Sequence, residues 1–153
     1  MLKRSRSPIH TAQIGRNLAR GIFKMPLRKK AMVLALKGNL GGGKTTFLQG
    51  FAKGLGIKEK ILSPTFIILK KFKIQNSKFQ CFYHIDCYRI QKPKDILDLG
   101  FKEIISSPKN IVAIEWADEI KKILPPDSVW LKFKFINKNK REIVIEWINE
   151  KAL

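Results

Sequence analysis

The glycine-rich segment Gly38-Asn39-Leu40-Gly41-Gly42-Gly43-Lys44-Thr45 limits what this chain can fold into more than any other feature. It fills the pattern G-x-x-x-x-G-K-[ST], in which glycines allow backbone N–H groups to turn toward a phosphate. The apolar run Ala31 to Lys37 indicates a buried strand before it, and apolar residues recur at helical spacing from Thr45 to Leu55. Because a helix N-terminus favours negative charge, this order of strand, glycine turn and helix makes a phosphate-binding loop. We therefore predict that the chain binds a nucleoside triphosphate with magnesium.

The residues of this loop have different predicted roles. Lys44 supplies a mobile cation for the β- and γ-phosphates and is expected to assist hydrolysis, and the Thr45 hydroxyl is a candidate magnesium ligand. The remaining predicted nucleotide contacts of the loop are Gly41, Gly42, Gly43 and Thr46.

A nucleotide-hydrolysing protein of this type needs a second acidic group, normally at the end of an adjacent strand, to complete the magnesium site. Two carboxylates fit, because Glu115 ends the apolar run Ile111 to Glu115 and Asp86 ends the more polar run Phe82 to Asp86. Spacing alone does not separate a metal-binding acid from an acid that orients water. The apolar run favours Glu115 for the metal, directly or through water, and Asp86 then orients the attacking water or contacts the γ-phosphate. The alternative is that both are strand-end carboxylates facing solvent.

Four other features allow two interpretations each. Ser63-Pro64-Thr65-Phe66 follows the loop helix, where switch segments often lie, so Thr65 either senses magnesium or γ-phosphate or belongs to a simple strand start. His84 is a catalytic candidate, although a histidine beside aromatic residues is more often packed and hydrogen-bonded. Arg89 either pairs with a carboxylate or phosphate or lies on the surface. Trp116 either walls the site or fills the core, the usual place for an aromatic residue.

The other elements follow from hydrophobic periodicity and turn residues. The first is a helix capped by Thr11 that runs to about Gly21, followed by an exposed basic connector over 24–30. Next come one strand that reaches Phe72 and another from Phe79 to Tyr88, which pair as an antiparallel hairpin. They are followed by a helical stretch from Lys94 to Ser106, a strand from Ile111 to Trp116, a short helix from Glu119 to Leu124, and a hairpin of Val129 to Ile136 with Glu142 to Trp147. This order predicts an α/β fold: a single P-loop NTPase-like domain over 1–153, with a mixed central β-sheet flanked by helices and a C-terminal β-hairpin. Residues 1–7 are expected to be flexible or to lie at an edge.

The composition of the chain bears on its number of domains, its partners and its location. A chain of 153 residues with 44% hydrophobic residues has the size and apolar content of one globular domain. Its 31 Lys and Arg against 12 Asp and Glu give a net charge of +19, which permits an RNA-containing partner but also fits a Lys-rich bias spread over the surface. The two cysteines match no disulfide framework or zinc pattern. No apolar run is long enough for a membrane helix or a secretory signal, so we expect a cytoplasmic protein without membrane contact.

Taken together, four ordered motifs resemble the TsaE (YjeE) family. They are the loop 38–46, Ser63-Pro64-Thr65-Phe66, His84-Ile85-Asp86-Cys87-Tyr88-Arg89 and Glu115-Trp116, and the resemblance spans roughly residues 8 to 147. It implies a small bacterial ATPase needed for threonylcarbamoyladenosine at position 37 of tRNAs. Such a protein joins the TsaB–TsaD pair, hydrolyses ATP slowly by itself and supports turnover of the transferase, with tRNA contacts that are indirect.

The resemblance also implies roles for individual residues. It assigns magnesium to Thr45 and Glu115, a part in hydrolysis to Asp86, and places near the nucleotide to Trp116 and Arg141. The chain departs from the family at Asn39, where an acid is usual, at Gly42, where Ala is usual, and at Cys87, where Leu is usual. The basic connector over 24–30 is longer than the family pattern.

Two other functions compete with this one. A P-loop also serves small-molecule or nucleoside kinases, although the chain has no compact Arg-rich lid segment. A basic RNA-binding module with a vestigial nucleotide site would bind tRNA alone with a steep salt dependence. The intact set Lys44, Thr45, Asp86 and Glu115 disfavours that module. ATP is favoured over GTP because no base-reading motif of the N-K-x-D type is present.

Overall fold

The computed structural model describes residues 1–39, 43–62, 68–76 and 78–147, so the predicted contacts of Gly41, Gly42 and Thr65 lie outside the described residues. The strands are β1 (Leu2–Ser5), β2 (Met32–Lys37), β3 (Leu69–Lys73), β4 (Cys81–Asp86), β5 (Asn110–Glu115), β6 (Val129–Phe135) and β7 (Arg141–Glu146). The helices are α1 (Pro8–Phe23), α2 (Lys44–Gly54), α3 (Pro93–Leu97), α4 (Phe101–Ser106) and the 3₁₀ helix η1 (Ala117–Ile123).

These strands form one sheet of seven strands in the order β1-β7-β6-β2-β5-β4-β3. The central strands β6, β2, β5 and β4 run parallel to one another, whereas β7 pairs with β6, β1 with β7 and β3 with β4 in antiparallel fashion. The predicted mixed α/β sheet and both hairpins are confirmed. Because parallel strands end at the same edge of a sheet, the carboxyl ends of β2, β5 and β4 meet there.

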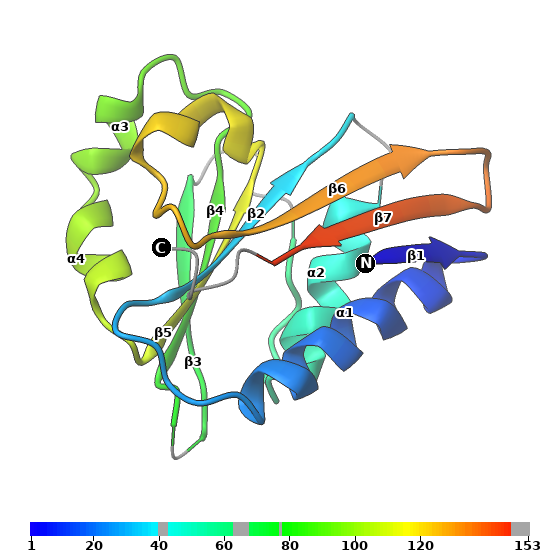
Figure 1. Cartoon of the computed structure of the whole chain (residues 1–153), viewed down its shortest axis with the longest axis horizontal. Helices are drawn as coiled ribbons and strands as arrows, with labels where there is room; N and C mark the ends of the chain where they lie inside the picture. Colours follow the sequence, from blue (N-terminus) through cyan, green and yellow to red (C-terminus); the bar gives the residue numbers. More distant parts are fainter. Residues whose placement is uncertain (40–42, 63–67, 77, 148–153) are drawn as a thin grey trace.

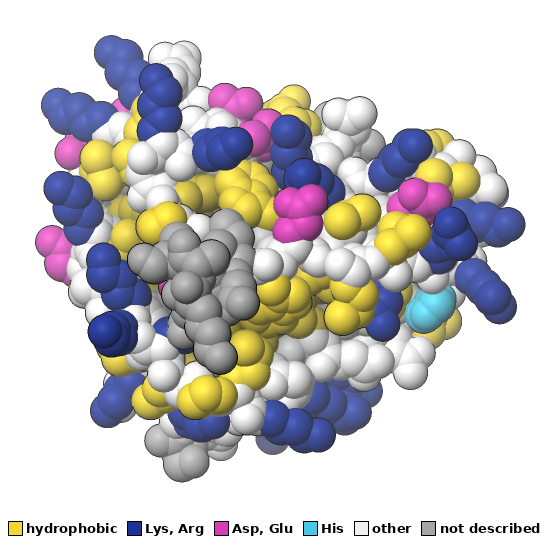
Figure 2. Space-filling model, viewed as in Figure 1, with side chains coloured by type: hydrophobic (Ala, Val, Ile, Leu, Met, Phe, Trp, Pro, Cys, Tyr) yellow, Lys and Arg dark blue, Asp and Glu magenta, His cyan; other side chains and the backbone are white. Residues whose placement is uncertain are grey.

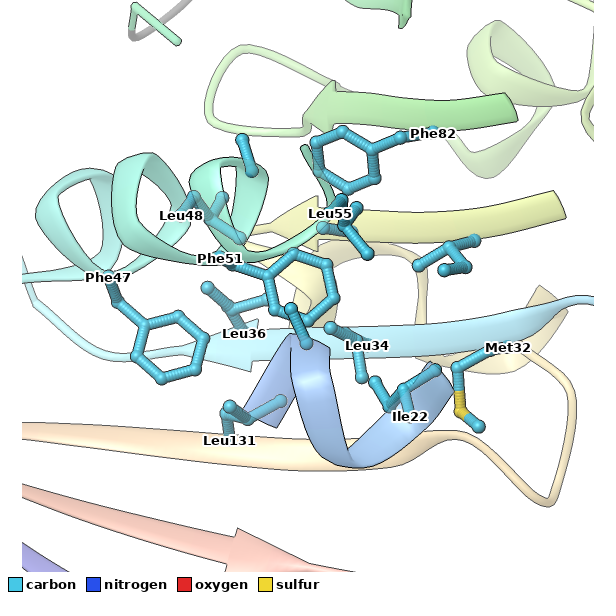
Figure 3. Packing of buried hydrophobic residues seen from close by; sticks show 14 of the residues in the cluster. Ile22, Met32, Leu34, Leu36, Phe47, Leu48, Phe51, Leu55, Phe82 and Leu131 are labelled. Atoms are coloured by element: carbon cyan, nitrogen blue, oxygen red, sulfur yellow. The ribbon is translucent and has the colours of Figure 1, made fainter. Parts of the chain in front are cut away.

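Helices cover both faces of the sheet, with α1 and α2 on one side and α3 and α4 on the other (Figure 1). Alternate residues of β2 divide between the two layers, as the two-residue period of a strand requires. Leu34 and Leu36 belong to the core under α1 and α2, whereas Val33 and Ala35 belong to the core under α3, α4 and η1. In Figure 3, Phe51 of α2 and Ile22 of α1 converge on Leu34. The strand that leads into the glycine loop is thus buried on both faces.

The first helix begins earlier than the sequence predicted. Ser7 caps it, since its hydroxyl accepts a 3.0 Å hydrogen bond from the backbone N–H of His10, and Pro8 is the first helical residue. Serine before proline is a stronger start signal than a lone threonine, so the assignment of Thr11 as the cap was wrong. Thr11 lies inside the helix, buried, with its hydroxyl paired to that of Ser5.

Two other predicted elements have different bounds in the structure. The helical stretch expected from Lys94 to Ser106 is two helices, because Gly100 between α3 and α4 has φ 85°. The strand expected to reach Trp116 ends at Glu115, and Trp116 turns the chain with φ 56°. This left-handed turn directs the chain into η1, immediately beside the carboxyl end of the strand.

The basic connector over 24–30 is anchored to the rest of the molecule. Arg28 donates hydrogen bonds to the backbone carbonyl and the carboxylate of Asp127, at 3.0 and 3.4 Å. Cys81 and Cys87 are both free thiols. None of the helices in the described residues is both long enough and apolar enough to span a bilayer.

Candidate functional site

Two glycines stand where the chain leaves β2 and where it enters α2. Gly38 has φ 148°, and a Cβ there would lie 2.5 Å from the backbone oxygen of Phe133 on β6. Gly43 has φ 92° and stands directly before the first residue of α2. Side chains are disfavoured at both positions, at the first by contact with β6 and at both by backbone conformation. The N-terminus of α2 lies at the carboxyl ends of the parallel strands, where Thr45 meets Glu115.

Lys44 begins α2 and is only 5% exposed. Its ammonium donates a hydrogen bond to the Gly38 carbonyl and lies 3.9 Å from the ring centroid of Trp116. Burial lowers the pKa of this amine, and the nearby carboxylates, led by Glu115 and then Asp86, oppose that shift. The structure thus places a buried cation beside two carboxylates at the end of the glycine loop.

Glu115 is held between two partners. Its Oε1 accepts a 3.3 Å hydrogen bond from the Thr45 hydroxyl, and its Oε2 lies 2.7 Å from Nε2 of His84. The side chains of His84 and Glu115 are 2% and 4% exposed. The alternative that Glu115 faces solvent is therefore wrong.

Asp86 ends β4 directly beside Glu115, its register partner on β5. One carboxylate oxygen, Oδ1, accepts a 2.9 Å hydrogen bond from the backbone N–H of Tyr88. Burial raises the pKa of Asp86, and the Tyr88 hydrogen bond partly offsets the effect. Asp86 is 9% exposed, so it too is largely withdrawn from solvent. A carboxylate in this environment is a stronger proton acceptor than one on the surface.

The chemistry of these side chains fits a magnesium ion. Mg²⁺ prefers oxygen ligands, keeps several waters and usually takes its other ligands from substrate phosphates and one or two carboxylates. The Thr45 hydroxyl and the Glu115 carboxylate supply such oxygens, and they lie next to one another at the N-terminus of α2. Among the described residues no group of three or more His, Cys, Asp or Glu is arranged to hold a metal ion.

Trp116 belongs to this site and to the core beneath it. Its ring lies under the Lys44 ammonium on one side and packs against Tyr88, with ring centroids 5.1 Å apart. It also contacts the core below α3, α4 and η1. Both interpretations offered by the sequence therefore hold in part. Arg89 is exposed, so the structure gives it no place in the buried cluster.

Arg141 and Thr46 lie to the other side of Gly43. They line a small cavity of about 30 Å³ together with Ser7, Thr11 and the β6–β7 turn residues Lys138 and Asn139. Arg141 is anchored there by hydrogen bonds to the backbone oxygens of Asn137 and Lys140, and its guanidinium lies 4.5 Å from the Phe135 ring centroid. The predicted site residues thus form two groups, one on each side of the start of α2.

Sequence reasoning offered His84 as a catalytic candidate or a packed residue but named no partner for it. It gave no site role to Ser7, Lys138 or Asn139. A parallel pairing of the strands ending at Asp86 and Glu115 would have placed His84 near Glu115, but that pairing is not readable from the sequence.

Comparison with known proteins agrees with the fold and the motifs. Residues 5–150 match the family described as threonylcarbamoyl adenosine biosynthesis protein TsaE. The tRNA threonylcarbamoyladenosine biosynthesis protein TsaE of Rickettsia typhi is 38% identical over 121 residues, which cover 78% of this chain and 80% of the relative. The protein of that name from Treponema pallidum is 33% identical over 141 residues, which cover 92% and 96%.

A solved structure is similar over nearly the whole length. The crystal structure of YdiB from Bacillus subtilis matches with a TM-score of 0.76 and 30% sequence identity, covering 99% of this chain and 87% of that one. The resemblance expected from the four motifs is confirmed by a family match over almost the entire chain and by this shared fold. The chain therefore belongs to the TsaE family.

Proposed function

We propose that this protein binds and hydrolyses ATP with magnesium in the formation of threonylcarbamoyladenosine at position 37 of tRNA, acting with a transferase pair of the TsaB–TsaD type. The relatives carry the name of that biosynthetic step. The observation that carries the ATPase part is the convergence of Lys44, Thr45 and Glu115 at the start of α2.

Each side chain has a definite task in this proposal. Lys44 and the N-terminus of α2 hold the β- and γ-phosphates, which present the negative charge that both favour. Thr45 and Glu115 hold the magnesium ion, which when bound neutralises phosphate charge. Asp86 orients the attacking water and accepts its proton as the oxygen bonds to the γ-phosphorus and the bond to the leaving ADP breaks.

The first test measures ATP affinity by titration calorimetry with Lys44→Ala. We expect binding to weaken about tenfold or more, since hydrogen bonds to charged groups contribute about 1.5–3 kcal/mol. Lys53→Ala is the matched control, because Lys53 is an exposed lysine of the same helix. Unchanged affinity in Lys44→Ala would refute the proposed site.

The second test separates binding from turnover with Asp86→Ala. This variant should bind MgATP with nearly normal affinity yet lose about 10²–10⁴-fold in hydrolysis, the usual contribution of a general base. Cells that carry only this variant should lack the tRNA modification, and normal modification in such cells contradicts the role of Asp86.

Dependence on partners is tested by measuring phosphate release with and without the transferase pair and tRNA. Stimulation only in the full mixture supports the proposal. Transfer of phosphate to a small molecule, in place of its release, would instead indicate a kinase.

A further inference from the structure

His84 is buried at the boundary between the hydrophobic core and the proposed magnesium site. Its side chain is 2% exposed, although an imidazole is polar and titratable. The residue two positions before it on β4, Phe82, belongs to the core, and the residue two positions after it is Asp86. A buried polar ring in this place needs a partner, and its Nε2 has one in Glu115 Oε2 at 2.7 Å.

The parallel register of β4 and β5 explains the contact. His84 lies opposite Ala113, and Asp86 lies opposite Glu115, two residues further along. Paired residues of a sheet and their second neighbours share a face, so all four side chains point toward α2. Ala113 is small, which leaves the space in which the Glu115 side chain and the imidazole meet.

This contact gives the two oxygens of Glu115 different surroundings. Oε2 is engaged by His84, whereas Oε1 faces the Thr45 hydroxyl at 3.3 Å. A glutamate has three side-chain torsions, and fixing a long side chain of this kind loses rotamer entropy. A hydrogen bond from a ring anchored in a strand fixes that geometry before any ligand arrives.

We propose that His84 is a positioning residue, which holds one oxygen of Glu115 so that the other is presented beside Thr45 to the nucleotide-bound magnesium. The inference rests on the proposed function, because it concerns the same site. Hydrogen-bonded partners of metal ligands commonly contribute 10–100-fold to metal affinity.

The test compares His84→Gln with His84→Asn in the full-length protein. The Gln amide nitrogen reaches as far from the backbone as Nε2 of histidine and can still donate to Glu115, whereas the Asn amide is one methylene too short. The measurements are ATP affinity by calorimetry without divalent metal, and affinity of the ATP complex for Mn²⁺ by electron paramagnetic resonance with Mg²⁺ competition. A melting curve for each variant confirms that it is folded.

We expect all three proteins to bind metal-free ATP within about twofold of one another. His84→Asn should lower metal affinity by about 10–100-fold, and His84→Gln should remain close to the original protein. In a Glu115→Gln background the same His84→Asn change should have little further effect, since it acts through that carboxylate.

Equal metal affinity in His84→Asn and the original protein would overturn the inference and leave His84 as a core residue. Equal loss in both His84 variants would also overturn it, because a reaching amide would then fail to replace the imidazole. If His84→Asn does not fold, His84→Leu takes its place against His84→Gln. Failure of the original protein to bind ATP with metal is a different result, which refutes the proposed function itself.

Discussion

At the scale of single residues, the site concentrates buried charge. Lys44, Asp86 and Glu115 are all less than a tenth exposed, and each would be more favourably solvated in the unfolded chain. Mutual attraction offsets part of this penalty, as the opposing influences on the pKa of Lys44 show. Sites that bind charged ligands commonly give up stability in this way, and removal of one charge should recover some of it.

Asp86→Asn is therefore expected to raise the melting temperature near neutral pH in the absence of nucleotide. The folded state raises the pKa of Asp86 above its ordinary value, so the ionised carboxylate destabilises the fold at pH values above that pKa. Asparagine resembles the protonated acid and can still accept the hydrogen bond from Tyr88. Below about pH 4, where folded and unfolded states are both protonated, the difference between the two proteins should disappear.

Melting curves from about pH 3 to pH 8 check the sign of this effect. A domain of this size shifts by about 2–4 °C for each kcal/mol. Asp98→Asn removes the charge of an exposed aspartate and is the control. A rise in the melting temperature of Asp86→Asn that is equal at every pH would indicate an effect of packing instead of charge.

At the scale of elements, glycines allow α1 and α2 to pack with their backbones in contact. A Cβ on Gly50 of α2 would lie 1.8 Å from the backbone oxygen of Ala12 on α1, and a Cβ on Gly15 would lie 2.2 Å from that of Phe47. Gly54 makes a third such approach, at 2.6 Å from the backbone oxygen of Arg16. Because α2 carries Lys44 and Thr45 at its start, this contact also sets the position of the nucleotide site.

Gly50→Ala should therefore destabilise the protein by about 3 kcal/mol, the upper part of the usual range for overpacking. Gly21→Ala is the matched control in α1, because a Cβ there meets nothing within 4 Å. Removal of an exposed helical glycine should stabilise by about 0.5–1 kcal/mol. Urea unfolding measures the free energy of unfolding of both variants. Similar values for the two would show that the helices separate readily.

At the scale of the whole molecule, the charge is unevenly distributed along the chain. Residues 1–80 hold 18 of the 31 Lys and Arg but one of the 12 Asp and Glu, Glu59. This part of the chain contains the strand β1, the helices α1 and α2, and the edge strand β3. Lys and Arg side chains surround the face shown in Figure 2, without gathering in a single patch. On this face the distribution suits diffuse attraction of polyanions better than a defined RNA site.

Binding to RNA should accordingly be weak and sensitive to salt. We expect fluorescence anisotropy to detect association with tRNA and with an unrelated RNA alike at 50 mM salt, and to detect neither at 200 mM. Release of counterions makes such affinity fall steeply over this range. Tight tRNA binding that survives 200 mM salt and exceeds binding of the unrelated RNA would favour an RNA-binding module.

Local sequence was sufficient for much of the fold. The glycines and apolar runs predicted β2 and α2 together, since these signals depend on neighbours only a few residues apart. The same applies to the two hairpins and to the acids at the ends of β4 and β5. Errors arose where local signals competed, as with Ser7 against Thr11, or where one backbone angle ended an element, as at Gly100 and Trp116.

The tertiary structure decided how the predicted residues meet. The sequence motifs identified Thr45, Asp86 and Glu115 as separate candidates. The contacts of Glu115 with Thr45 and His84 depend on the register of β4 and β5 and on where α2 packs. Parallel register joins segments about thirty residues apart, and the packing of both helical layers fixes it for the sheet as a whole. The sequence by itself therefore determined which chemical groups are present and at which strand ends. Only the folded core determined which oxygen of Glu115 faces Thr45, because that orientation depends on contacts between distant strands.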